Sequence, residues 1–125
     1  MRVLLADGQT KVRSALHLLL DQQSGLDVVG EAADAESLLT LVEMTPPDLL
    51  LIDWELPGRQ AADLLHALRE CRPHLSVIAL SGQPEARRAA LAAGADAFVS
   101  KGDPPERLLA ALGDCRCRLQ VNSIE

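Results

Sequence analysis

The sequence predicts an α/β protein built on a doubly wound parallel sheet of five strands, with helices on both faces. Short runs of apolar, β-type residues alternate with longer amphipathic stretches, which is the pattern of βαβ units. The run DLLLID at residues 48–53 carries four consecutive apolar residues, as expected of a strand buried on both faces of a parallel sheet. The 125 residues suffice for one domain with a sizeable core.

The expected strands and helices alternate strictly along the chain. Strands are expected at residues 2–6, 26–32, 48–53, 75–81 and 96–100. Helices are expected at about 10–22, 35–44, 59–71, 84–92 and 104–115. No linker or low-complexity segment interrupts this alternation, so residues 1–115 are expected to form one domain. The patternless residues 116–125 are expected to form a poorly ordered tail.

Glycine, proline and aspartate mark several of the helix ends. Gly25 closes the first helix, and Gly94 stands where a C-terminal cap of the fourth helix belongs. Asp103 precedes Pro104, which predicts an N-cap followed by proline in the first turn of the fifth helix.

Composition excludes several classes of protein. Only 2% of the residues are aromatic against 48% hydrophobic, so the core must consist of Leu, Val, Ile and Ala. A net charge of -6 argues against contact with nucleic acid, which requires a basic surface. No apolar run reaches membrane-spanning length, and Asp7 interrupts the first one too early for a signal peptide. Cys71, Cys115 and Cys117 form no disulfide framework, which predicts a reduced, cytoplasmic protein.

Four polar residues stand at the carboxyl ends of predicted strands. Asp7 follows the first strand and Asp53 ends the third, while Ser81 ends the fourth and Lys101 follows the fifth. Right-handed crossovers bring these ends to one edge of the sheet, where doubly wound folds bind their ligands. Two carboxylates, a hydroxyl and an ammonium group suit a phosphoryl group with a divalent cation.

Three motifs give these residues a family context. They are LLLIDWELPG at 49–58, IALSG at 78–82 and AFVSK at 97–101. With them the chain resembles, over residues 2 to about 115, the receiver domain of two-component response regulators. The stretch VLLADGQTKVRSAL is closest to receivers that precede a helix-turn-helix output domain. The resemblance implies a flavodoxin-like sheet of order 2-1-3-4-5. It also implies phosphorylation, with Mg²⁺, by a histidine kinase or phosphotransfer protein.

The resemblance assigns a role to each motif residue. Asp53 is the expected phosphoacceptor, Ser81 the hydroxyl that turns toward the phosphoryl group, and Lys101 the cation that pairs with it. Phe98 is the expected aromatic that changes rotamer on activation, so Ser81 and Phe98 form the expected switch. Gly82 keeps room for the phosphoryl group.

One departure from the family pattern concerns the cation. The family has two adjacent acids after the first strand, where this chain has Asp7 and Gly8. Asp7 matches the acid that acts on the metal through water, and Gly8 replaces the direct ligand. Fewer carboxylates predict weaker Mg²⁺ binding, on which phosphotransfer depends. Glu55, two residues after Asp53, could restore the missing charge, so the expected metal residues are Asp7, Asp53 and Glu55.

Several functions stay open at this level. A non-enzymatic, phosphorylatable switch is favoured by Asp53, Ser81 and Lys101, whereas Gly8 favours a pseudo-receiver that binds partners without being phosphorylated. An aspartyl-phosphate hydrolase would need further acids, and a nucleotide- or flavin-binding enzyme would need a glycine-rich loop or stacking aromatics. Gln83, two residues after Ser81, stands where the family tunes dephosphorylation.

The resemblance also bears on assembly. Family dimers often use the fourth helix, fifth strand and fifth helix, which predicts a possible homodimer through these elements. No DNA-binding segment follows the fifth helix, so the chain is expected to be either a stand-alone receiver or a fragment of a longer regulator.

Overall fold

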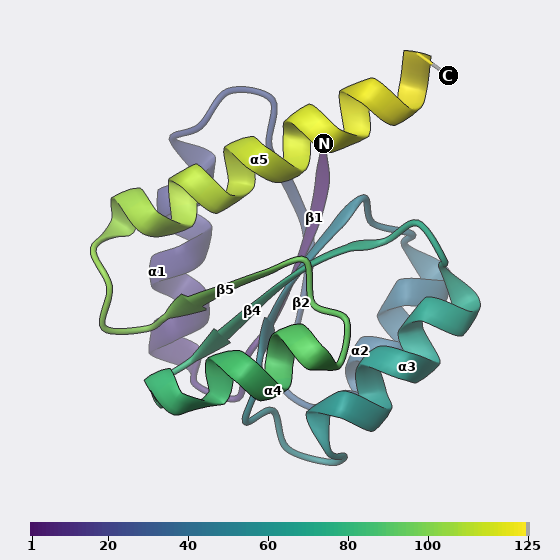
Figure 1. Ribbon diagram of the computed structural model, residues 1–125, viewed down its shortest axis with the longest axis vertical. Coiled ribbons are helices and arrows are strands. Elements are labelled where there is room, and N and C mark those ends of the chain that lie inside the picture. Colours follow the sequence, from purple (N-terminus) through teal and green to yellow (C-terminus); the bar gives the residue numbers. More distant parts are fainter. Residues whose placement is uncertain (125) are drawn as a thin grey trace.

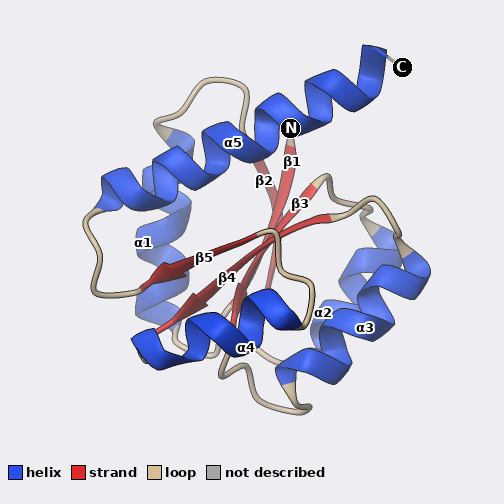
Figure 2. Ribbon diagram, viewed as in Figure 1, coloured by secondary structure: helices blue, strands red, loops and turns tan. Residues whose placement is uncertain are grey.

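The computed structural model describes the backbone of residues 1–124 and the side chains of residues 1–118. Its five strands form one parallel sheet in the order β2-β1-β3-β4-β5, which confirms the predicted topology (Figure 2). The strands are β1 (Arg2–Ala6), β2 (Asp27–Ala32), β3 (Leu49–Asp53), β4 (Ser76–Ser81) and β5 (Ala97–Ser100).

Helices cover both faces of this sheet, as predicted (Figure 1). One face carries α1 (Thr10–Asp21) and α5 (Pro105–Ile124). The other carries α2 (Ala35–Met44), α3 (Ala61–Cys71) and α4 (Arg87–Ala92), the last preceded by a 3₁₀ turn at Pro84–Ala86. None of the described helices is both long enough and apolar enough to span a membrane.

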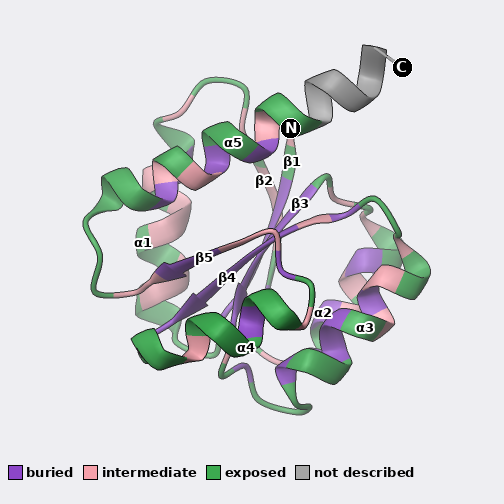
Figure 3. Ribbon diagram, in the orientation of Figure 1, coloured by how far each residue is buried: buried purple, intermediate pink, exposed green. Residues whose placement is uncertain are grey.

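Two apolar layers form the core, one on each face of the sheet. In β1, Leu4 packs with the layer under α2, α3 and α4, whereas Val3 and Leu5 pack with the layer under α1 and α5. In β3, Leu50 joins the first layer and Leu51 the second. All five residues of β3 are buried, as predicted for a central strand, and Figure 3 shows the central strands almost entirely in the buried colour.

Gly94 ends α4 as the sequence predicts. Its φ of 106° lies in the left-handed region, which glycine adopts without a steric penalty. The Gly94 N–H donates to the Leu91 carbonyl at 3.1 Å, and the Ala95 N–H donates to the Ala90 carbonyl at 3.1 Å. These two bonds form a Schellman motif, which satisfies carbonyl groups that the helix end would leave unpaired.

Some helix boundaries differ from the prediction. Residues 84–92 form a 3₁₀ turn followed by α4 rather than one α-helix, with Pro84 opening the turn. The third helix begins at Ala61, two residues late, because the backbone of its N-cap Gln60 is extended, with φ of -67° and ψ of 137°. Pro57 and Gly58, whose φ is 109°, form a turn ahead of this cap.

The expected N-cap and C-terminal end of the fifth helix were wrong as well. It begins at Pro105, and the Asp103 carboxylate accepts a hydrogen bond from the Ser100 N–H at 3.1 Å instead of capping the helix. The helix continues to Ile124 rather than ending near residue 115, because no proline follows Pro105 and Gly113 alone does not stop it. The poor order expected for residues 116–125 stays a prediction.

Candidate functional site

The carboxyl edge of the sheet gathers the four polar residues that the sequence places there. The Lys101 N–H donates to the Ser81 carbonyl at 2.8 Å and the Trp54 N–H to the Leu80 carbonyl at 2.7 Å, so the sheet ladder continues past the strand ends. An open cavity of about 390 Å³ lies above this edge. It is lined by Gly8, Gln9, Asp53, Glu55, Pro57, Gly82 and Lys101.

Lys101 lies between the two aspartates. Its Nζ is 2.8 Å from Asp7 Oδ2 and 3.3 Å from Asp53 Oδ2. The side chain of Asp7 is 1% exposed and that of Asp53 is 7% exposed, so both charges are nearly removed from water. Buried carboxylates need a cation or hydrogen bonds to offset their lost hydration. The ammonium group of Lys101 meets this need for both of them.

Backbone N–H groups bind the Oδ1 atoms of the two aspartates, on the side that Lys101 does not contact. Asp7 Oδ1 accepts from the Gln9 N–H at 2.8 Å, and Asp53 Oδ1 accepts from the Glu55 N–H at 3.0 Å. Each bond joins a residue to the second residue after it, so the loops after β1 and β3 turn back over their own aspartates. The carboxylates are therefore held in place before any ligand arrives.

The pKa values of Asp53 and Lys101 are both raised, for different reasons. Burial raises the pKa of Asp53 most, and the charge of Asp7 adds to this, while the Glu55 N–H and Lys101 oppose it. Burial alone would lower the pKa of Lys101, but the 2.8 Å contact with Asp7 and the charges of both aspartates outweigh burial and raise it. Lys101 therefore stays protonated beside the carboxylates.

The Ser81 hydroxyl is bonded to Glu55. Both carboxylate oxygens of Glu55 lie 2.8 Å from Ser81 Oγ, which also accepts from the Gln83 N–H at 2.9 Å. Ser81 is fully buried. Glu55 thus lines the same cavity as Asp53, but its carboxylate is directed to the serine of the neighbouring strand. The metal role expected of Glu55 stays a prediction.

The space around the two glycines of the site differs. A Cβ atom on Gly8 would lie 3.2 Å from Pro57 Cδ and 3.3 Å from Pro57 Cγ, which is a crowded contact. A Cβ atom on Gly82 would meet nothing within 4 Å, because Gly82 borders the open cavity. The room that the sequence predicted beside Gly82 is present. The position of the missing acid, by contrast, lies against Pro57.

The donor atoms fit Mg²⁺ in kind but are few in number. Asp7 Oδ2 is buried and has no well-aligned hydrogen bond among the described residues, although Lys101 lies close to it. With the oxygens of Asp53 it offers the hard, anionic ligands that Mg²⁺ prefers. In the part of the chain whose side chains are described, no three His, Cys, Asp or Glu residues are grouped to hold a metal ion. The pair Asp7 and Asp53 would hold the cation.

Phe98 lies away from this edge, in the core. It is 8% exposed and packs in the layer that contains Ala90 of α4 and Ala95. Its inward position is compatible with the rotamer change implied by the resemblance, and that change stays a prediction.

Arg13 of α1 makes contacts at the site that the sequence did not predict. Its Nη1 donates to the Asp7 carbonyl at 2.6 Å, and its Nε donates to Glu31 Oε1 on β2 at 3.3 Å. Arg13 therefore ties the loop after β1 to the neighbouring strand. In the sequence it resembles any solvated helix charge, so only its place in the first turn of the helix, six residues after Asp7, could have pointed to it.

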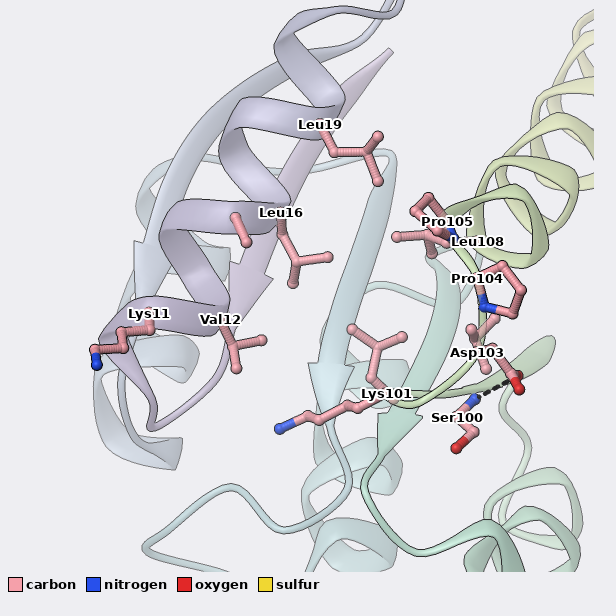
Figure 4. A pocket seen from close by; sticks show the side chains of 13 residues that line it. Lys11, Val12, Leu16, Leu19, Ser100, Lys101, Asp103, Pro104, Pro105 and Leu108 are labelled. Atoms are coloured by element: carbon pink, nitrogen blue, oxygen red, sulfur yellow. Dashed lines mark hydrogen bonds between the residues drawn. The ribbon is translucent and has the colours of Figure 1, made fainter.

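An apolar groove adjoins the site on the face of α1 and α5 (Figure 4). It encloses about 420 Å³ between α1, β5 and the first turn of α5. Leu16 and Leu19 of α1 face Leu108 of α5 across it, and Leu80 lies among its lining residues. Lys101 lines both this groove and the cavity above Asp53, so the two adjoin the same side chain.

Comparison with known proteins agrees with this arrangement. A family model described as the response regulator receiver domain matches residues 3–113. The nitrate/nitrite response regulator NarL of Escherichia coli K12 is 35% identical over 112 residues, 88% of this chain and 52% of NarL. The chain thus spans about half the length of that relative.

Two solved receiver structures superpose closely on this chain. The isolated receiver domain of RcsB from Salmonella enterica serovar Typhimurium, with phosphomimetic BeF₃⁻, has a TM-score of 0.81 and 27% identity. The superposition covers 91% of this chain and 88% of the RcsB receiver chain. The receiver domain of NarL from Mycobacterium tuberculosis has a TM-score of 0.81 and 29% identity. This superposition covers 91% of this chain and 94% of the NarL receiver chain. This chain therefore belongs to the response regulator receiver domain family of two-component systems.

Proposed function

We propose that this receiver domain accepts a phosphoryl group on Asp53 and thereby switches a protein-binding surface. One observation carries the proposal: Lys101 lies 3.3 Å from a nearly buried Asp53 carboxylate that borders an open cavity. A carboxylate in this position is exposed to a donor on one side only. Lys101 supplies the positive charge that phosphoryl oxygens require.

Asp53 acts as the nucleophile in the proposed transfer. One of its oxygens forms a bond to phosphorus as the donor's P–N or P–O bond breaks, and the leaving group keeps the electron pair. Lys101 pairs with the phosphoryl oxygens, and Asp7 and Asp53 would hold Mg²⁺. When bound there, Mg²⁺ would supply further positive charge for those oxygens. Ser81, at the neighbouring strand end, donates its hydroxyl hydrogen to the transferred group.

Intact mass after exposure to acetyl phosphate tests this proposal. We expect a single phosphoryl adduct that forms only with Mg²⁺, because phosphotransfer depends on the cation. The adduct should form slowly, because Gly8 supplies no carboxylate to bind that cation. Asp53→Asn should remove the adduct completely, since an amide cannot form the acyl phosphate. An adduct that persists in Asp53→Asn, or maps to another residue, would contradict the assignment.

A pseudo-receiver is the second candidate. It is favoured by Pro57, which lies against position 8, and by Glu55, which is bonded to Ser81 rather than placed beside Asp53. No adduct at saturating Mg²⁺ would establish this alternative. The homodimer through α4, β5 and α5 and the cytoplasmic location are compatible with both candidates and stay predictions.

The phosphodonor protein is proposed to dock in the groove between α1 and α5. A histidine kinase or phosphotransfer protein must bring its phosphohistidine to Asp53, and this apolar groove shares Lys101 with the cavity above Asp53. Buried apolar contacts at such a surface contribute most of the binding energy. No contact of this chain with nucleic acid is proposed.

Substitutions on the exposed side of α1 test the docking surface. Ala15 is exposed and lines the groove, whereas its neighbour Ser14 is exposed and does not. Ala15→Glu should slow phosphotransfer from the kinase about tenfold, because a charge enters an apolar interface, while Ser14→Glu should have little effect. Modification by acetyl phosphate should be equal in both variants. Equal kinase rates would contradict this docking site.

A further inference from the structure

The bond between Glu55 and Ser81 uses all of the hydroxyl's donor capacity. A serine hydroxyl carries one hydrogen, and here it is given to a carboxylate with both oxygens at 2.8 Å. Oγ also accepts from the Gln83 N–H at 2.9 Å, which fixes the orientation of the hydroxyl. Because Ser81 is fully buried, no solvent competes for this hydrogen. The bond is of the charge-assisted kind, which is among the stronger ones.

This bond conflicts with the role of Ser81 in the proposed function. Phosphoryl oxygens only accept hydrogen bonds, so Ser81 can bind them only after it leaves Glu55. A phosphoryl group on Asp53 would also increase the negative charge in the cavity that Glu55 lines. Like charges repel in such a confined site. Glu55 therefore has to move when the site is occupied.

Glu55 has both the freedom and a destination for this movement. Glu55 is exposed, so its side chain can turn without repacking the core. Its N–H is bonded to Asp53 Oδ1 at 3.0 Å, which keeps the base of the side chain beside the aspartates. Gly8 lines the same cavity and offers no carboxylate, so a cation held by Asp7 and Asp53 would lack one anionic ligand. The Glu55 carboxylate would supply that charge if it turned from Ser81 toward the aspartates.

We propose that Glu55 alternates between Ser81 and the cation site, so that cation binding releases the Ser81 hydroxyl for the phosphoryl group. This inference rests on the proposed function of Asp53. Glu55 is then a positioning residue for Ser81 in the resting state. Because linkage is reciprocal, Ser81 must weaken cation binding to the same extent that the cation weakens the Glu55–Ser81 bond.

Mg²⁺ affinity in four proteins measures this linkage. Titrations followed by calorimetry and by Trp54 fluorescence would compare the wild type, Ser81→Ala, Glu55→Gln and the double variant. We expect Ser81→Ala to tighten Mg²⁺ binding about tenfold, because Glu55 no longer has to break a charge-assisted bond. We expect Glu55→Gln to weaken binding, and Ser81→Ala to have no effect in that background. Gln83→Ala is a matched control, since no hydrogen bond involves its side chain among the described contacts.

A nuclear magnetic resonance measurement on the unmodified serine covers the case in which Ser81→Ala fails to fold. The Gln83 amide donates to Ser81 Oγ, so its resonance should shift with Mg²⁺ in the wild type and much less in Glu55→Gln. Unchanged affinity in a folded Ser81→Ala, equal tightening in both backgrounds, or equal shifts of the Gln83 amide would overturn the inference.

The two proposals fail separately. The acetyl phosphate adduct on Asp53 is measured on the same proteins by mass. An adduct without the linkage would overturn the alternation of Glu55 and leave Asp53 as the phosphoacceptor. Linkage without an adduct would support the alternation and overturn the phosphorylation of Asp53.

Discussion

Replacing Lys101 with methionine is expected to lower the free energy of unfolding by about 3 kcal/mol at neutral pH. Methionine keeps the length of the side chain but removes the only cation within 4 Å of the Asp7 and Asp53 carboxylates among the described side chains. Removing one member of a buried charge group leaves the others without compensation. The value lies at the lower end for such groups because the cavity above Asp53 is open to water. Urea unfolding followed by Trp54 fluorescence and circular dichroism measures it.

The difference in unfolding free energy between the wild type and Lys101→Met should depend on pH in two ways. The pKa of Lys101 is raised in the folded protein, so its contribution is complete at neutral pH. It disappears as the pH rises from about 10.4 through the folded-state value. The pKa of Asp53 is raised too, and it should rise further without Lys101, whose charge opposes that shift. The variant should therefore recover stability as the pH falls through the folded-state pKa of Asp53 toward about 3.9.

Lys11→Met is the matched control. Lys11 lines the groove beside the site, but it is exposed and makes no ion pair within the described residues. Its replacement should change the free energy of unfolding by no more than about 0.5 kcal/mol. The Lys101→Met variant should also bind beryllofluoride much more weakly than the wild type, because it lacks the ammonium group that would pair with the fluorine atoms. A variant as stable as the wild type at neutral pH would show that water, not Lys101, compensates the aspartates.

The sequence predicts the sheet and the convergence of its strand ends for a physical reason. A run such as LLLI at 49–52, within a chain that alternates strand-type and helix-type segments, favours the middle of a parallel sheet, where both faces are covered. Once the strands are parallel, the crossovers place Asp53, Ser81 and Lys101 on one edge whatever the details of packing. Backbone topology therefore determines which residues share the site.

The directions of the side chains do not follow from topology. The bond from Ser81 to Glu55 joins residues 26 positions apart and depends on how two loops lie over the sheet. The contact of position 8 with Pro57 likewise depends on the turn after β3. Arg13 could have pointed to solvent with the same helical pattern. Such contacts are decided by long-range packing, which a local pattern does not contain.

Restoring the missing acid with Gly8→Asp is expected to tighten Mg²⁺ binding by about tenfold or more. A further carboxylate adds a full charge next to Asp7 and Asp53, and a unit pair at 4 Å is worth about 4 kcal/mol before hydration losses at an effective dielectric constant of about 20. Without metal the same charge repels both aspartates, and one Lys101 cannot offset all three. We expect the metal-free variant to lose about 2 kcal/mol of stability.

Crowding by Pro57 must be separated from charge in this experiment. A Cβ at position 8 lies 3.2 Å from Pro57 Cδ, so any side chain requires the turn after β3 to shift slightly. Gly8→Ala carries the crowding alone, and Gly8→Asn adds the shape of the side chain without its charge. Both controls should leave Mg²⁺ affinity near that of the wild type, and the stability of Gly8→Asp relative to Gly8→Asn should be restored by saturating Mg²⁺.

The Mg²⁺ affinity of Gly8→Asp also tests the role proposed for Glu55. If Gly8→Asp supplies the third carboxylate, the cation no longer draws Glu55 from Ser81, and Ser81→Ala in this background should leave Mg²⁺ affinity unchanged. The bond between Glu55 and Ser81, with both oxygens at 2.8 Å, would then survive cation binding. Unaltered Mg²⁺ affinity in Gly8→Asp itself would mean that Glu55 or water already fills the position, so that the glycine costs the wild-type site nothing.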